Sequence, residues 1–68
     1  MREVPITTDS IRLGQFLKLA DLIEVGSDAK LVLEDGLVSV NGEPEARRGR
    51  TLVRGDVVTV DGEDLRVG

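Results

Sequence analysis

The chain has no cysteine, histidine, tryptophan or tyrosine, and one phenylalanine is its only aromatic residue. The absence of cysteine excludes a disulfide framework and a thiolate metal site, and the absence of histidine removes the most common general base and zinc ligand. The adjacent carboxylates Glu34 and Asp35 would point in different directions on a helix, and no nucleophile stands beside a base. We therefore expect a protein that is not an enzyme and that carries no cofactor or metal.

Long apolar runs are also missing, since no stretch of about 18 apolar residues is present to span a membrane. The first residues, Met1 to Pro5, do not follow the basic-then-apolar order of a signal peptide. We therefore expect a cytoplasmic protein without a membrane partner. At 68 residues the chain predicts one small domain, residues 1–68, in which nearly every apolar side chain shares one core.

Positive charge is scarce, because 13 Asp and Glu oppose 9 Lys and Arg and give a formal net charge of −4 at pH 7. Such a balance repels polyanions at long range. The arginine-rich connector, which joins the apolar segments 37–40 and 57–60, is an exception because it holds four of the seven arginines: Arg47, Arg48, Arg50 and Arg54. Charges farther apart than about 8 Å are largely screened at physiological ionic strength, so a local cluster can still attract an anion. The connector therefore predicts a site for a negatively charged partner.

Two short helices are predicted in the first half of the chain. Thr8, Asp9 and Ser10 are typical of a helix N-terminus. The apolar residues that follow recur at helical spacing and place one face against a core: Leu13, Phe16, Leu17, Ala20 and Ile23. Gly26 is expected to end this helix in a left-handed conformation. A second helix then runs to Gly36, with a buried stripe of Ala29, Val32 and Leu33.

The first helix also carries a polar row, because Arg12, Gln15 and Lys18 lie three residues apart on another side. This row faces either solvent or a ligand. For Lys18 taken alone, an ordinary solvent-exposed position is the simpler interpretation.

From Leu37 the apolar period changes to two, which indicates β-strands. Asn41-Gly42 and Asp61-Gly62 are typical of two-residue hairpin turns, which need a positive φ at both positions. Pro44 cannot donate a ladder hydrogen bond, so we expect the chain to leave regular pairing at the arginines and to return near Leu52.

The order of these elements predicts an α+β domain, in which two short packed helices are followed by a small, mainly antiparallel sheet of three to four strands. Residues 1–10 are expected to form an N-terminal arm or an edge strand. Pro5 favours an edge position because it lacks the backbone donor that a central strand needs.

Five short motifs occur along residues 12–60 at compatible spacings. They are Leu13-Gly14-Gln15-Phe16-Leu17-Lys18-Leu19-Ala20, Ala29-Lys30, Val40-Asn41-Gly42, Arg47-Arg48-Gly49-Arg50 and Gly55-Asp56-Val57-Val58. Together they resemble the αL RNA-binding motif, the domain named after ribosomal small-subunit protein S-four. They are most similar to the stand-alone bacterial members of the YaaA and YbcJ type.

The resemblance implies that the two helices and the following hairpin form one surface that docks on structured RNA, such as ribosomal or transfer RNA. It implies by position that Arg12, Lys30 and Asn41 contact phosphates or sugars. Asn41 is also the natural first residue of a hairpin turn, and both roles can hold. We expect the domain to be a monomer that needs no cofactor.

The resemblance further implies that Arg47, Arg48 and Arg50 extend the RNA-binding surface. Guanidinium groups suit this role, since they pair bidentately with phosphate oxygens and stack on exposed bases. Arg54 completes the set of candidate RNA-binding residues. The alternative is that its stem only covers apolar surface beside a turn.

Four positions depart from the wider family. Gly14 stands where the family favours Asp after Arg-Leu, and Gly26 stands where it favours arginine. Glu34 and Asp35 occupy the end of the second helix, where the family tends to be basic. These differences move the expected RNA contact from the second helix to the arginine-rich connector.

Other interpretations stay open. The arginines of the connector would need no external partner if they only paired with Glu43, Glu45 or carboxylates across the fold. Exposed pairs of this kind are worth about 0–1 kcal/mol and give little reason to concentrate arginines. A β-grasp sulfur carrier would share the Asn41-Gly42 turn, but such carriers use a C-terminal Gly-Gly and this chain ends in Val67-Gly68. A protein-interaction adaptor would use an acidic face that includes Asp21, Glu24, Asp28, Glu34 and Asp35.

Overall fold

The computed structural model describes the backbone of residues 1–23 and 26–68, and the side chains of residues 1–23 and 30–68. Its helices and strands follow in the order β1 (Arg2–Val4), β2 (Ser10–Arg12), α1 (Leu13–Leu19), α2 (Gly26–Glu34), β3 (Val38–Val40), β4 (Glu43–Pro44), β5 (Thr51–Val53), β6 (Val57–Val60) and β7 (Glu63–Val67). The predicted α+β class is confirmed.

The described strands form a larger and a smaller sheet. The larger has the order β1-β7-β6-β3-β4 and is antiparallel except for the parallel pair of β1 and β7. The smaller pairs β2 with β5 in antiparallel register. These strands exceed the predicted three to four, because β1, β2 and β4 have only two or three residues and are too short to show an alternating pattern.

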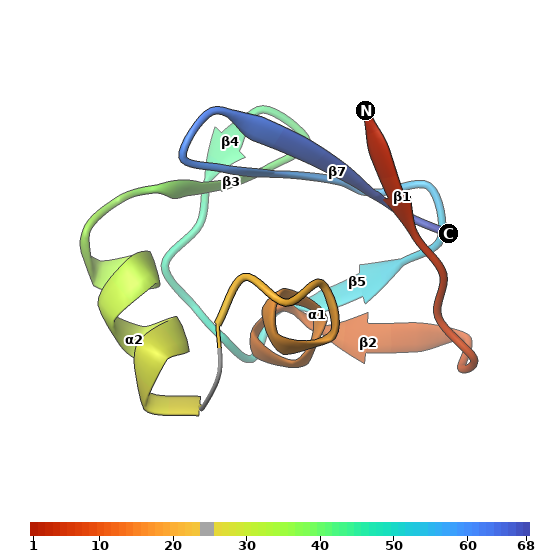
Figure 1. The fold of residues 1–68 in the computed structure, drawn as a ribbon, viewed down its shortest axis with the longest axis horizontal. Coiled ribbons are helices and arrows are strands. Elements are labelled where there is room, and N and C mark those ends of the chain that lie inside the picture. The colour runs from red at the N-terminus through yellow and green to blue at the C-terminus, as the bar shows by residue number, and fades with distance from the viewer. Residues whose placement is uncertain (24–25) are drawn as a thin grey trace.

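Figure 1 shows how the two layers are arranged. The larger sheet forms one layer, while α1, α2 and the smaller sheet form the other. α1 lies between α2 and the β2–β5 pair, as the helix at the centre of the view. β1 occupies an edge of the larger sheet, followed at once by Pro5.

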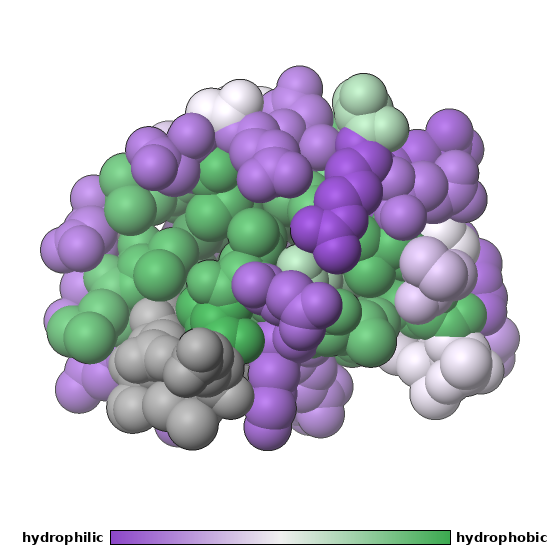
Figure 2. Space-filling model, viewed as in Figure 1, coloured by the Kyte–Doolittle hydropathy of each residue, from purple (hydrophilic) through white to green (hydrophobic). Residues whose placement is uncertain are grey.

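The core lies between these layers. Leu13, Phe16 and Leu17 of α1 are fully buried, as the helical spacing predicted. They share one hydrophobic cluster with sheet residues that include Val58 and Leu65. Figure 2 shows hydrophobic residues across the middle of one face of the molecule, interrupted by hydrophilic side chains, and hydrophilic residues along its upper edge.

Both predicted hairpin turns are confirmed. Asn41 and Gly42 have φ values of 52° and 85° and connect β3 to β4. Asp61 and Gly62 have φ values of 48° and 83° and connect β6 to β7. All four positions therefore have the positive φ that two-residue turns require.

α1 ends at Leu19, about one turn earlier than its apolar stripe predicted. The N–H groups of Asp21 and Leu22 donate to the carbonyl oxygens of Lys18 and Leu17, at 3.1 and 3.0 Å respectively. Asp21 has a φ of 61°. These bonds form a Schellman motif in which the left-handed residue is Asp instead of the more usual Gly.

The boundary between the helices also differs from the prediction. α2 begins at Gly26, so this residue belongs to α2 and does not end α1. Ile23 is buried as predicted although it lies beyond α1. Val32 and Leu33 pack in or against the core, whereas the predicted burial of Ala29 concerns a side chain outside the described residues.

Candidate nucleic-acid interface

The arginine loop, residues 45–50, connects β4 to β5 and docks on the start of α1. The N–H of Leu13 donates to the carbonyl oxygen of Arg50 at 2.8 Å, and the N–H of Gly14 donates to that of Arg48 at 2.9 Å. The first N–H groups of a helix have no partner within it and must find one elsewhere. Here the carbonyl groups of the loop satisfy them, so the loop is held against α1.

Arg12 strengthens the same contact from the residue before α1. Its Nη1 donates to the carbonyl oxygen of Gly49 at 3.2 Å. Three consecutive carbonyl groups, at residues 48–50, therefore accept hydrogen bonds from residues 12–14. Arg12 is also opposite Thr51 in the β2–β5 pair, so strand pairing continues the docking of the loop.

Gly14 allows this close approach. A Cβ at this position would lie 3.3 Å from the Cβ of Arg48 and 3.5 Å from its carbonyl oxygen. Gly14 is the position at which the wider family favours Asp. A side chain there would press against Arg48 of the loop, because even its Cβ would be in close contact. The glycine therefore fits the way in which the loop packs in this chain.

The three arginines of the loop differ in their partners. The Nε of Arg47 lies 3.1 Å from Oε1 of Glu45, and the Glu45 side chain is only 9% exposed. Among the described side chains, the ion pairs involve Lys30, Arg47 and Arg54. Arg48 and Arg50 thus have no described carboxylate partner, and Arg48 is exposed to solvent. The hydrogen bonds from residues 12–14 place the backbone of Arg48 and Arg50 beside Arg12.

Asn41 has partners within the fold. Its Oδ1 accepts a hydrogen bond from the N–H of Val57 at 2.9 Å, and its Nδ2 donates to Oδ1 of Asp56 at 3.2 Å. The other carboxylate oxygen of Asp56 accepts from the N–H of Val53 at 2.9 Å. The side chain of Asn41 therefore joins the β3–β4 turn to the turn that precedes β6.

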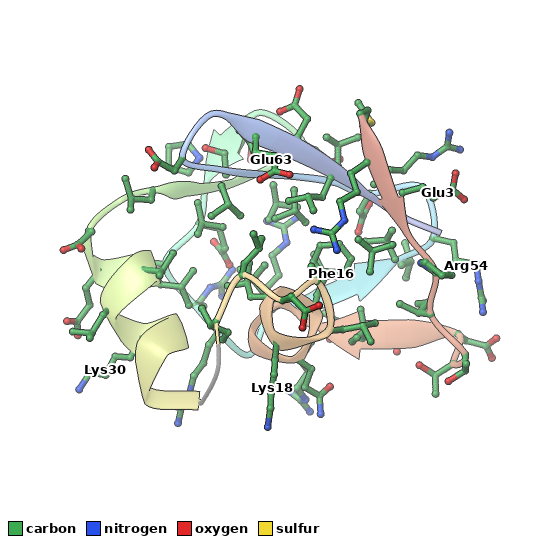
Figure 3. All side chains as sticks on the ribbon, viewed as in Figure 1. Glu3, Phe16, Lys18, Lys30, Arg54 and Glu63 are labelled. Carbon is green, nitrogen blue, oxygen red and sulfur yellow. The ribbon has the colours of Figure 1, made fainter. Side chains whose placement is uncertain are left out.

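Arg54 also has intramolecular partners, and they lie in the N-terminal arm. Its Nη2 donates to the carbonyl oxygen of Ile6 at 3.0 Å, and its Nη1 lies 3.8 Å from Oδ1 of Asp9. Figure 3 shows Arg54 at the opposite side of the molecule from Lys30. The candidate residues are therefore not all brought together, because Lys30 and Arg54 mark two separate ends.

Lys30 lies on α2 and is exposed. Its Nζ is 3.9 Å from Oε1 of Glu34, one helical turn further along. Figure 3 shows Lys30 and Lys18 both pointing away from the larger sheet, while Glu63 lies on that sheet. Lys30 and Lys18 therefore add positive charge to the helical side of the molecule, where Glu34 and Asp35 are also exposed.

Within residues 1–23 and 26–68, no helix is long and apolar enough to cross a membrane. The same described residues include no group of three or more His, Cys, Asp or Glu side chains placed to hold a metal ion. The arginine loop itself carries three guanidinium groups, at Arg47, Arg48 and Arg50, and one carboxylate, at Glu45. Guanidinium groups bind anions directly.

A model of the S4 domain family matches residues 4–68, which includes α1, α2, the arginine loop and nearly all of the larger sheet. The chain belongs to the S4 domain family. This S4 domain is similar to the probable ribosome maturation protein RlbA of Bacillus subtilis (strain 168), with 54% identity over 59 residues that cover 87% of this chain and 83% of that protein.

The fold of this S4 domain is also similar to a solved structure, the 30S ribosomal protein S4e from Thermoplasma acidophilum. The TM-score is 0.66 at 25% sequence identity, and the match covers 88% of this chain. The chain spans 32% of the length of S4e. The family resemblance inferred from the sequence motifs is therefore confirmed by a family model and by fold.

Proposed function

We propose that this S4 domain binds structured RNA through Arg12, Arg48 and Arg50, with Arg47 beside them. The observation that supports the proposal most strongly is the docking of residues 48–50 on α1 by three hydrogen bonds. A loop that is held in one conformation loses little conformational entropy on binding. Arg48 and Arg50 have no carboxylate partner among the described residues, so no ion pair has to break first.

The chemistry of these side chains suits RNA phosphates. Each guanidinium group has five N–H donors in a planar fork and can bind a phosphate bidentately. Arg12 uses one donor on Gly49 and keeps the others. We infer that the surface neutralises about three or four phosphates, which predicts a salt-dependent affinity. The net charge of −4 does not oppose this strongly, because distant carboxylates are screened.

The remaining candidate residues have different proposed roles. Lys30 is exposed on α2 and contributes charge at the margin of the surface, where its exposed pair with Glu34 is weak. Asn41 and Arg54 contribute through the fold, since their side chains bind Asp56, Val57 and Ile6. Any direct RNA contact that they make is secondary to those bonds.

The names of the relatives suggest which RNA is bound. One relative is named as a probable ribosome maturation protein and the other as a ribosomal protein. We therefore propose ribosomal RNA as the partner, in the cytoplasm, and a monomeric, non-catalytic role for the domain. Transfer RNA remains the other structured RNA that a shape-reading surface would accept.

Ultraviolet crosslinking in cells tests this function directly. We expect the wild-type chain to recover ribosomal RNA, and the double variant Arg48→Glu, Arg50→Glu to recover much less. The control is Arg66→Glu, because Arg66 is exposed on β7 between the buried Leu65 and Val67 and therefore faces away from the core. Equal recovery of RNA by wild type and the double variant would refute the proposed surface.

A further inference from the structure

A groove of about 470 Å³ lies between the N-terminal arm and the exposed side of α1. Pro5 and Ile6 line it from the arm, while Ile11 and Leu19 line it from β2 and α1. Leu19 is 50% exposed, so the core does not account for all of its apolar surface. The groove is therefore an open, mainly apolar depression beside a charged helix face.

The exposed side of α1 connects this groove to the arginine loop. Gly14 contacts Arg48, and Lys18 stands one helical turn further along the same side. Lys18 and Gln15 both line the groove. Figure 3 shows the Lys18 side chain projecting from α1 away from the larger sheet. An extended ligand that lies on Arg48 thus meets Lys18 and then the groove.

The polar groups of the groove have unused hydrogen-bonding capacity. Oε1 of Gln15 accepts from the N–H of Arg12 at 3.3 Å, which leaves its amide nitrogen free to donate. The hydroxyl of Thr8 donates to the carbonyl oxygen of Ser10, which leaves its oxygen free to accept. The described residues that line the groove include Lys18 and no carboxylate. In an acidic chain this composition favours an anionic ligand.

We propose that the groove holds one unstacked base of the bound RNA, with an adjoining phosphate on Lys18. The inference rests on the proposed function, since it extends the same RNA strand beyond the arginine loop. A base has two apolar faces for the aliphatic walls and polar edges for Gln15 and Thr8, whereas a phosphate alone would gain nothing from those walls. Bases in RNA loops and bulges are available for such insertion.

An apolar protein side chain is the competing occupant. It would fill the walls formed by Ile6, Ile11 and Leu19, but it would leave Lys18 and the amide of Gln15 without a role. The charge and the continuity with the arginine loop therefore favour RNA. Ile6, which lines the groove, belongs to the N-terminal arm, and Arg54 donates a hydrogen bond to its carbonyl oxygen. The groove therefore depends on an ordered arm.

Methyl NMR of the full chain tests the proposal. The probes are the four nucleoside 5′-monophosphates, and ribose 5-phosphate is the control that lacks a base. We expect the methyl signals of Ile6, Ile11 and Leu19 to shift and saturate with at least one nucleotide. Ribose 5-phosphate should leave these signals in place. Shifts that are absent with every nucleotide, or equal with ribose 5-phosphate, would overturn the base site.

Leu19→Gln and Leu31→Gln form a matched pair of variants. Both leucines are exposed helix residues, at 50% and 60%, and neither substitution alters the net charge. We expect Leu19→Gln to weaken nucleotide binding about fivefold, because it removes apolar surface from the groove. Leu31→Gln on α2 should have no effect. If the two variants bind the nucleotide equally, the groove is not the site.

RNA binding by the same proteins separates this inference from the proposed function. If the arginine variants lose RNA while nucleotides leave the groove methyls unshifted, the arginine surface stands and the base site is wrong. The arginine surface and the base site are both wrong if the arginine variants bind RNA as well as wild type and no nucleotide shifts the methyl signals of the groove. Methyl shifts with a protein partner, but with no nucleotide, would assign the groove to protein and also overturn the base site.

Discussion

The N–H of Gly14 lies 2.9 Å from the carbonyl oxygen of Arg48, and no side chain separates the two backbones. This contact ties the first turn of α1 to a loop more than 30 residues later in the chain. Two further hydrogen bonds, from Leu13 to Arg50 and from Arg12 to Gly49, join the same two segments. The position of the proposed RNA-binding arginines is thus set by the start of α1.

Gly14→Ala should reduce RNA affinity without unfolding the domain. The new Cβ would lie 3.3 Å from the Cβ of Arg48, so the arginine loop has to shift by a few tenths of an ångström. We expect affinity to fall about threefold to tenfold as the arginines lose their preset position. Alanine favours a helix by about 1 kcal/mol over glycine, which offsets the cost of the close contact with Arg48. The free energy of unfolding should therefore change little. Unchanged affinity, with the domain folded, would show that the close contact does not position the loop.

Glu45→Gln should increase RNA affinity. Glu45 neutralises Arg47 through a contact of 3.1 Å, and glutamine would leave Arg47 able to bind a phosphate. We expect one more phosphate contact, seen as a salt slope steeper by about 0.7 to 0.9. Binding titrations at several salt concentrations measure it. A slope equal to that of wild type would mean that Arg47 does not reach the RNA.

Asn41→Gly should destabilise the fold and spare RNA binding by the folded protein. Glycine tolerates the φ of 52°, so the variant removes only the side-chain bonds to Asp56 and Val57. We expect the free energy of unfolding to fall by about 0.5–1.5 kcal/mol, because two exposed hydrogen bonds are lost and water can take the place of the acceptor at the N–H of Val57. Urea denaturation measures the free energy of unfolding. If Asn41 contacts RNA directly, the variant will instead bind RNA more weakly at urea concentrations at which it is still folded.

Arg54→Lys separates the two proposed roles of Arg54. Lysine retains the charge but not the fork that donates to Ile6 and contacts Asp9. We expect faster amide hydrogen exchange in the arm, at residues 6–8, and a nearly unchanged salt slope for RNA binding. Arg54→Ala should speed exchange to a similar extent. If only the alanine variant affects RNA binding, and the arm is unaffected in both, Arg54 is an RNA contact.

Features with local causes were predictable from the sequence. The turns at 41–42 and 61–62 require residues that accept positive φ. The dipeptides Asn-Gly and Asp-Gly are favoured at such turns and predict them directly. The buried stripe of α1 follows from its spacing. The end of α1 was missed because Asp21, and not a glycine, takes the left-handed conformation.

Features that depend on distant segments were not predictable in this way. β2 and β5 are short and about 40 residues apart in sequence, so no local pattern indicates that they pair. For the same reason the docking of the arginine loop on α1 left no local signal except Gly14 in place of the family's Asp. The sequence did single out the arginine cluster by its charge, but not which of its members pair with Glu45, Asp9 or the backbone.

The salt dependence of binding to a fragment of ribosomal RNA tests the central claim most directly. The comparison is between wild type, the double variant Arg48→Ala, Arg50→Ala and the control Arg66→Ala. Arg48 and Arg66 are exposed and Arg50 is partly buried, and none of the three has an ion pair among the described residues. Substitutions away from the core and from such pairs usually change stability little, so all three proteins should remain folded.

We predict that the double variant binds more weakly and that its slope of log affinity against log salt is shallower by about 1.4 to 1.8, as expected for two lost phosphate contacts. The control should retain the wild-type slope. A double variant with the affinity and the slope of wild type would contradict the proposed RNA-binding surface.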